Sequence, residues 1–160
     1  MGQRPRAAAP HGPHSRVTVW WPLRADGTAN ASADPEIAVL AFAAPLTFLN
    51  ADAFGREFVE AVRPGQSPVR LAILEAAGMV EIDFTGAQAL IEVVGICRKA
   101  GVIFAVARLE SVAAQEAFGR LGLRALIGGE PIFESVANAV ESLRPSAEER
   151  GPGTAAVQTD

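Results

Sequence analysis

The feature that most constrains this chain is the stretch Ala72–Gly101, where an apolar run, a short loop and a periodic apolar segment follow one another. The run Val69–Ala76 is apolar almost throughout, which is typical of a central strand covered on both faces. After the loop, apolar residues return at the spacing of one helix face. These residues are Ala87, Leu90, Ile91, Val94 and Cys97. The stretch therefore predicts a strand, a loop and a helix.

An acid and a hydroxyl residue lie at the junction between that strand and helix. The junction reads Glu81-Ile82-Asp83-Phe84-Thr85-Gly86-Ala87. Thr85 is placed to be the N-cap, and Gln88 three residues later completes a capping-box pattern. A helix start also exposes unpaired N–H groups, which would hold a phosphate on Thr85, although Glu81 and Asp83 would repel it. Spacing alone favours the plain cap over the switch.

Asp83 allows two interpretations that do not exclude each other. It is either a loop carboxylate that helps to cap the next helix or part of a recognition surface beside Thr85. The trio Glu75, Glu81 and Asp83 lies near one strand end, but one strand and its following loop rarely supply a full cage for a hard cation. We therefore expect no bound metal ion.

The remaining pattern between Glu36 and Arg144 predicts one layer of sheet covered by helices, without an internal repeat. Further strands are expected at Ile37–Phe42, Leu46–Leu49, Val102–Ala107 and, as a short last strand, Arg124–Ile127. Further helices are expected from Asn50 to Pro64, from Ser111 to Gly122 and from Ile132 to Leu143.

Residues 1–35 and 145–160 differ in composition from the domain between them. Both are rich in Ala, Pro, Gly and charged residues, so we expect a flexible leader and a disordered tail around a domain at 36–144. Within the leader, Arg16–Trp21 is a β-prone patch that would either add an edge strand or mark a partner surface. His11 and His14 have no Cys or acidic ligands nearby, so a metal site there is not expected.

Composition excludes several classes of protein. The formal net charge is -4 and Lys99 is the one lysine, so no basic patch of nucleic-acid-binding size is present. The apolar stretch Ile37–Leu49 is shorter than the roughly 20 residues of a membrane span, and Pro45 interrupts it. We expect a domain that does not insert into a membrane. Cys97 is the single cysteine, which rules out an internal disulfide and indicates a small core residue.

Enzyme chemistry is hard to build from this domain. No histidine lies between Glu36 and Arg144, so a histidine base is missing. The domain also has neither a Gly-x-x-x-x-Gly-Lys phosphate loop nor a Gly-x-Gly-x-x-Gly turn. We therefore expect a protein that is not an enzyme and needs no cofactor.

The string Ile82–Ala87 resembles the signature loop of STAS domains, in which an Asp, one variable residue, a Ser or Thr and a Gly lead into a helix. Such domains occur at the cytoplasmic end of SulP-type anion permeases and as free-standing anti-sigma-factor antagonists. In the antagonists the hydroxyl residue before the Gly is phosphorylated, so the resemblance makes Thr85 a phosphorylation candidate. Phe84 stands where many relatives carry a small polar residue, and its ring would either hinder a kinase or serve as a contact.

Three further stretches are similar to the permease branch. They are Pro45–Ala51, Val102–Leu109 with its Ala107-Arg108 pair, and the closing segment from Leu121 to Val140. The resemblance implies an α/β fold of the STAS type, with a small mixed sheet of about four to five strands covered by about four helices.

The resemblance also implies a function. It points to a non-catalytic regulatory or protein-interaction domain like the cytoplasmic module of SulP sulfate and anion transporters, held at the inner face of the membrane by a permease core. The alternative is an anti-sigma-factor antagonist that binds an anti-sigma factor or kinase until it is phosphorylated. Nucleotide sensing, proposed for STAS domains in general, is a third possibility that nothing in these residues supports independently. The implied interaction surface consists of Asp83, Phe84, Thr85, Gly86 and Gln88.

Overall fold

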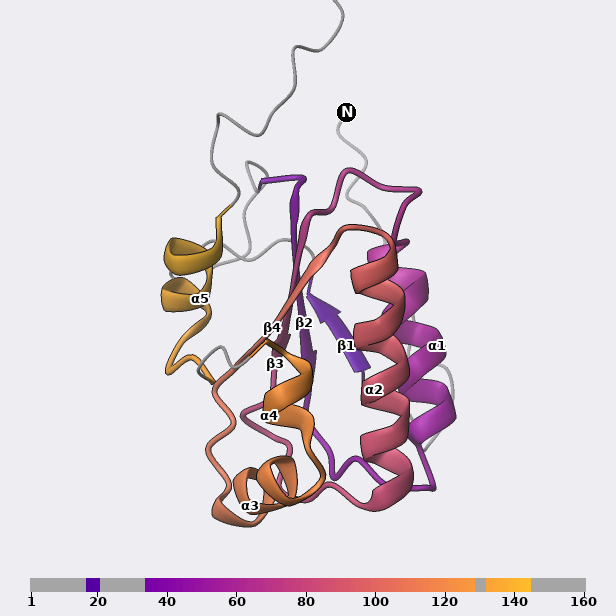
Figure 1. Cartoon of the computed structure of the whole chain (residues 1–160), viewed down its shortest axis with the longest axis vertical. Helices are drawn as coiled ribbons and strands as arrows, with labels where there is room; N and C mark the ends of the chain where they lie inside the picture. Colours follow the sequence, from indigo (N-terminus) through magenta and orange to yellow (C-terminus); the bar gives the residue numbers. More distant parts are fainter. Residues whose placement is uncertain (1–16, 21–33, 129–131, 145–160) are drawn as a thin grey trace, which may run out of the picture.

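A computed structural model describes residues 17–20, 34–128 and 132–144, and they form an α/β fold (Figure 1). Strands alternate with helices through most of the chain. In chain order the elements are β1 Val17–Trp20, β2 Ile37–Phe42, α1 Ala51–Val62, β3 Leu71–Glu75, α2 Phe84–Lys99, β4 Ile103–Ala107, α3 Val112–Arg120, α4 Leu123–Leu126 and α5 Val136–Leu143. The leader, apart from β1, and the tail from 145 lie outside the described residues, so the expectations for them stay predictions.

The strands form one mixed sheet in the order β1-β2-β3-β4. β2, β3 and β4 are parallel and β1 pairs antiparallel with β2, which agrees with the expected small mixed sheet of the STAS type. β1 is an edge strand because β2 is the only described strand that pairs with it. Val17 lies opposite Phe42, so β1 begins where β2 finishes. The three parallel strands finish at one end of the sheet, here called the carboxyl end, and the loops 43–50, 76–83 and 108–111 follow there.

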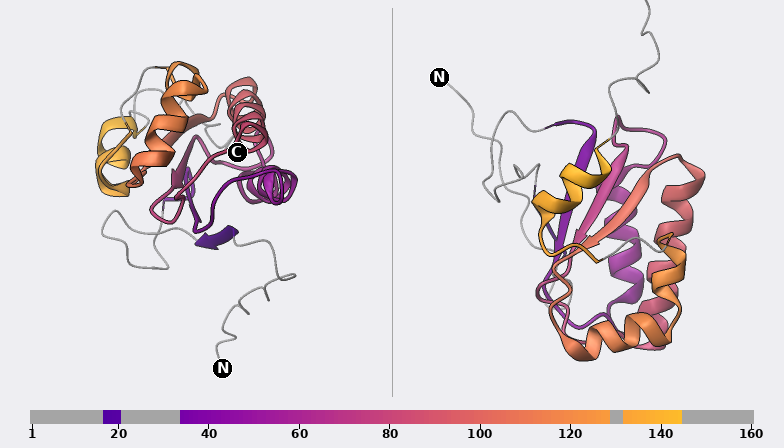
Figure 2. Two further views of the ribbon diagram at one scale, coloured as in Figure 1. Left: turned by 90° about the horizontal axis from the view of Figure 1, so that it is seen from below. Right: turned by 60° about the vertical axis from the view of Figure 1, so that its left-hand side comes forward.

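The sheet is covered on both faces, as the apolar runs predict. On one face α1, α2, α3 and α4 enclose the larger core, in which the fully buried Phe54 and Phe58 pack near Phe42 and Phe104. On the other face α5 covers a smaller core that includes Ile73, Ala105 and Ala139. Figure 2 shows α5 on the opposite side of the sheet from α1 and α2. Both faces of β3 are therefore buried, which explains its unbroken apolar run.

Two expected strands are wrong, and the last expected helix starts later than predicted. Leu46 makes a single parallel bridge to Ile82 and residues 47–50 form a turn, so no strand covers 46–49. The segment 124–127 belongs to the short helix α4 and its end, because Gly122 in a left-handed conformation (φ 75°) reverses the chain into another helical turn. The last helix starts at Val136, with Ser135 as its cap, because Phe133 instead pairs with Ala107.

Candidate functional site

The cap of α2 is Asp83 and not Thr85. Asp83 has an extended backbone (φ -90°, ψ 178°), and its Oδ1 accepts a hydrogen bond from the Gly86 amide at 2.7 Å. Helix α2 therefore begins at Phe84, and Thr85 lies inside its first turn. Asp is as good an N-cap as Thr, and here the carboxylate has a second partner, so the expected cap at Thr85 is wrong.

That second partner lies in the loop between β2 and α1. Asp83 Oδ2 accepts a hydrogen bond from the Phe48 amide at 2.8 Å, across 35 residues of sequence. Backbone bonds join the same loops, from the Leu46 amide to the Glu81 carbonyl (2.9 Å) and from the Asp83 amide to the Leu46 carbonyl (3.1 Å). One carboxylate thus ties the start of α2 to the loop in front of α1.

Asn50 fixes the rest of that loop. It occupies the N-cap position of α1 as the sequence predicts, but its side chain makes no bond to the helix. Its Oδ1 accepts from the Thr47 amide at 2.9 Å and its Nδ2 donates to the Pro45 carbonyl at 2.8 Å. The backbone that carries Phe48 is therefore held from both sides.

The same junction requires glycine at position 86, because a side chain there would meet the neighbouring loop. A Cβ at this position would lie 2.2 Å from the Leu46 carbonyl oxygen and 2.7 Å from its carbon. Both are backbone atoms, so they cannot turn aside as a flexible side chain would. Gly86 is also buried, so within the predicted interaction surface it acts by allowing this contact.

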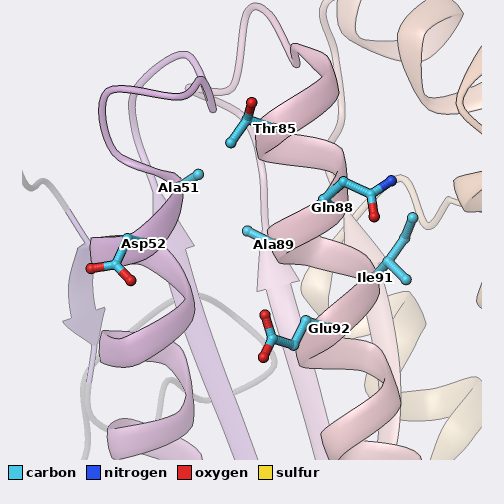
Figure 3. A pocket seen from close by; sticks show the side chains of 7 residues that line it. All are labelled: Ala51, Asp52, Thr85, Gln88, Ala89, Ile91 and Glu92. Carbon is cyan, nitrogen blue, oxygen red and sulfur yellow. The ribbon is translucent and has the colours of Figure 1, made fainter.

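The other predicted surface residues point outward. Phe84, Thr85 and Gln88 are exposed, and Asp83 is half-buried. Thr85 and Gln88 line a shallow hollow of about 350 Å³ together with Ala51, Asp52, Ala89, Ile91 and Glu92. Figure 3 shows that this hollow lies between the first turns of α1 and α2. Its ionisable residues are Asp52 and Glu92, and Asp52 is paired with Arg56 on the next turn of α1 at 3.3 Å.

The Thr85 hydroxyl makes no hydrogen bond to any residue that the structure describes. Asp83 already serves the cap, and the free hydroxyl lies at the open start of the helix. The sequence predicts a competition between capping and modification at Thr85, and the geometry frees this residue from the first role. Whether Thr85 is phosphorylated stays a prediction.

Glu75 and Asp83, expected near each other at one strand end, have separate partners. Arg108 has a left-handed backbone (φ 58°), and its guanidinium lies 3.1 Å from both Glu75 and Glu110. No group of three or more potential metal ligands is brought together in residues 17–20, 34–128 and 132–144. Glu75 is therefore engaged in an ion pair and Asp83 in a helix cap, whereas Glu81 is exposed.

Cys97 lies in the core on the inner face of α2. Its side chain is buried, and burial raises the pKa of the thiol to about 11, because the thiolate would lose its hydration. The thiol therefore stays protonated at neutral pH, which fits the small core residue expected from the sequence.

Sequence reasoning named Phe84 but missed four other exposed apolar side chains at the carboxyl end. Five such side chains surround the junction, and we call them the apolar rim: Phe48, Leu49, Val80, Phe84 and Val112. The sequence predicts a short strand at Leu46–Leu49, since no local pattern reveals the pairing of Leu46 with Ile82. The Asp83–Gly86 spacing, an Asp three residues before a close-packed Gly, is the local signal that identifies the true cap.

The chain has relatives of known family. The profile of the STAS domain family matches residues 28–139, and the chain belongs to this family. STAS domains are generally non-catalytic. In the described part of the chain, no helix has both the length and the apolar character needed to cross a membrane.

Two curated relatives are transporters. "Solute carrier family 26 member 10" of Mus musculus is 30% identical over 122 residues, which cover 70% of this chain and 18% of that protein. A "probable sulfate transporter" of Mycobacterium tuberculosis is 31% identical over 110 residues, which cover 69% of this chain and 20% of that protein. The chain thus spans about a fifth of the length of these relatives, and it is related to the STAS domains of SulP and SLC26 transporters.

Two solved structures show how widely the fold is shared. A "sulfate transporter family protein" from Wolinella succinogenes has a TM-score of 0.60 and 21% identity, covering 74% of this chain and 93% of that one. A "putative anti-sigma factor antagonist" from Thermotoga maritima also has a TM-score of 0.60, at 14% identity, covering 70% of this chain and 91% of that one. Both branches of the family therefore share this fold.

Proposed function

We propose that this chain is a non-catalytic regulatory domain that binds a protein partner through the junction at the start of α2. The supporting observation is that Asp83 fixes two loops at once, so that Phe84 and Thr85 are exposed on a firmly held backbone. Rigid exposed positions bind with a smaller ordering cost than mobile ones. Because the sequence relatives are transporters, the proposed partner is a SulP-type permease core, which would hold the domain at the inner face of the membrane.

The experiment is affinity capture from detergent-solubilised lysate of the native host, with the full chain as bait. Thr85→Glu places a charge at the junction, and Ser142→Glu places the same charge on exposed α5 as a matched control. We expect the wild type and Ser142→Glu to retain a polytopic membrane protein of the permease family, and Thr85→Glu to retain less. Capture of no permease by the wild type, or equal capture by all three baits, would contradict the proposal.

A second candidate function is partner switching as an anti-sigma-factor antagonist. It is favoured by the Thr85 hydroxyl, which is exposed and free of cap duty. A phosphate would add about -1.5 to -2 charge at pH 7 to a hollow that already contains Asp52 and Glu92. Among the described residues, no cation lines the hollow to bind the phosphate, so the added charge would stay exposed and change the surface that the partner contacts.

Phosphopeptide mapping of the chain isolated from its own host tests this candidate. A phosphate on Thr85, together with a soluble kinase-like protein captured by the wild type and released by Thr85→Glu, would support partner switching. Absence of phosphate under every growth condition would contradict it and leave the permease-module proposal untouched.

A further inference from the structure

The apolar rim concentrates exposed apolar side chains at one end of the molecule. Its five members are between 53% and 75% exposed. They account for five of the six large apolar side chains that are exposed among the described residues. The sixth, Ile103, is 43% exposed and lies at the opposite end, where β4 begins. Apolar exposure this localised is typical of an interaction site.

Hydrogen bonds across the loops bring the rim residues together. The bond from the Phe48 amide to Asp83 holds the loop that carries Phe48 and Leu49 against the residue before Phe84. The Ser111 hydroxyl donates to the Val80 carbonyl at 2.8 Å, across 31 residues, and places Val112 next to Val80. Figure 1 shows the starts of α1 and α2 at the same end of the sheet as α3. The rim is therefore assembled from three segments that are distant in sequence.

The charges around the rim are almost all negative. The loops 43–50, 76–83 and 108–111 contain Glu81, Asp83 and Glu110 and a single cation, Arg108. That cation is already paired with Glu75 and Glu110 at 3.1 Å. Glu81 is exposed, and no ion pair involves it within the described residues. A partner would therefore meet an apolar centre beside the unpaired carboxylate of Glu81.

We propose that the apolar rim binds a basic amphipathic helix of a partner protein. The inference rests on the proposed function and adds the chemistry of the partner segment: apolar residues along one stripe cover Phe48, Leu49 and Phe84, and flanking Lys or Arg residues face Glu81. Complementary charge around an apolar contact fixes orientation and accelerates encounter. A lipid surface fits less well, because an anionic membrane would be repelled by the same carboxylate.

The test uses the full chain and designed helical peptides, with dissociation constants from fluorescence anisotropy at low salt. One peptide has a leucine stripe flanked by lysine, a second replaces lysine with glutamate, and a third has the first composition scrambled so that the stripe is lost. The variants are Phe48→Ser with Phe84→Ser, Glu81→Lys, and Ile103→Ser as the control at the other end. Circular dichroism checks that each variant is folded, which is expected because every changed side chain is exposed.

We expect the basic striped peptide to bind the wild-type chain with a dissociation constant at least about tenfold lower than that of either other peptide. The double Phe variant should lose about tenfold and Ile103→Ser should bind like wild type. Glu81→Lys should weaken the basic peptide, and added salt should weaken it further. Equal binding of the acidic and basic peptides, no effect of the double Phe variant, or flotation of the chain with anionic or zwitterionic vesicles would overturn the inference.

These outcomes separate the inference from the proposed function. If a permease core binds at Phe84 but the designed peptides show no preference for positive charge, the function stands and the inference fails. If the basic striped peptide binds at the rim but the host contains no partner, the inference about surface chemistry stands and the proposed function fails.

Discussion

The two ends of the sheet differ in how their loops are held and in what they expose. At the carboxyl end, side chains join loops that lie 31 and 35 residues apart, through Ser111 and Asp83. At the amino end, the long-range side-chain bond is an ion pair between Arg144 and Asp34 (3.2 Å, 110 residues apart), and the Ser67 hydroxyl donates to the Val62 carbonyl five residues earlier. The carboxyl end carries the apolar rim, whereas the amino end exposes Ile103 among the large apolar side chains described there.

This difference shows that the exposed apolar residues are not on the loosest part of the surface. They lie where the backbone is fixed by a buried glycine contact, a shared carboxylate and several backbone bonds. Holding an apolar side chain out in water has no benefit for folding, so rigid support at this place favours a role in binding.

The largest effect should come from filling the close contact at Gly86. In Gly86→Ala the new methyl group would meet the Leu46 carbonyl at 2.2 Å, and the loops must separate. We expect a loss of about 3 kcal/mol or more in the free energy of unfolding, measured by urea denaturation.

Gly95→Ala is the matched control for that substitution, because it changes the same residue types in the same helix. Nothing lies within 4 Å of a Cβ at Gly95, so we expect stabilisation by up to about 1 kcal/mol from the better helix propensity of Ala. Equal stability of the two variants would show that the junction is not tightly packed.

Removing the shared carboxylate should cost less than crowding Gly86 but more than losing an ordinary cap. Asp83→Ala removes a cap and leaves the Phe48 amide without its partner, so we expect a loss of about 1–2 kcal/mol. Ser135→Ala removes a cap whose second bond, to Asn138 Oδ1, stays within α5 and joins no other loop, and we expect about 1 kcal/mol there. A smaller loss for Asp83→Ala than for Ser135→Ala, in the same urea series, would contradict the bracing role.

Between the two ends, Cys97 reports on the common core. Its folded pKa is about 11 against 9.0 for the unperturbed thiol, so the folded state retains the proton when the unfolded chain loses it. The stabilisation of the fold by the protonated Cys97 thiol is fully present below pH 9 and is lost as the pH rises through about 11. We expect the unfolding free energy of the wild type to fall more steeply over this range than that of Cys97→Ala, and parallel curves would contradict it.

The smallest effects on stability should come from the exposed residues of the junction. In Phe84→Ser and Thr85→Glu no buried contact is lost, and an acid in the first turn of α2 is favourable. We expect the free energy of unfolding, measured by thermal denaturation, to change by less than about 0.5 kcal/mol in each variant. A large destabilisation would mean that these side chains serve the fold, and would remove the reason to assign them to binding.

Much of this fold is predictable from local pattern, since the apolar runs of β2, β3 and β4 and the periodic stripes of α1 and α2 are strong signals. The signature Ile82–Ala87 also located the junction. What local pattern could not provide was the tertiary pairing of Leu46 with Ile82, on which the cap at Asp83 and the exposure of Phe48 depend. The sequence predicts a strand at 124–127, but the left-handed backbone of Gly122 leads the chain into the short helix α4 instead.

The most direct test of the central claim is site-specific photocrosslinking in the native host, with p-benzoylphenylalanine in place of Phe84 or, at the opposite end, Ile103. Both positions are exposed and both tolerate a large apolar side chain by this account. The account predicts that the probe at position 84 crosslinks to one defined protein partner, identified by mass spectrometry as a permease core, and that the probe at position 103 does not. Crosslinking of the same partner from position 103 but not from position 84 would contradict the claim that the carboxyl end is the binding surface.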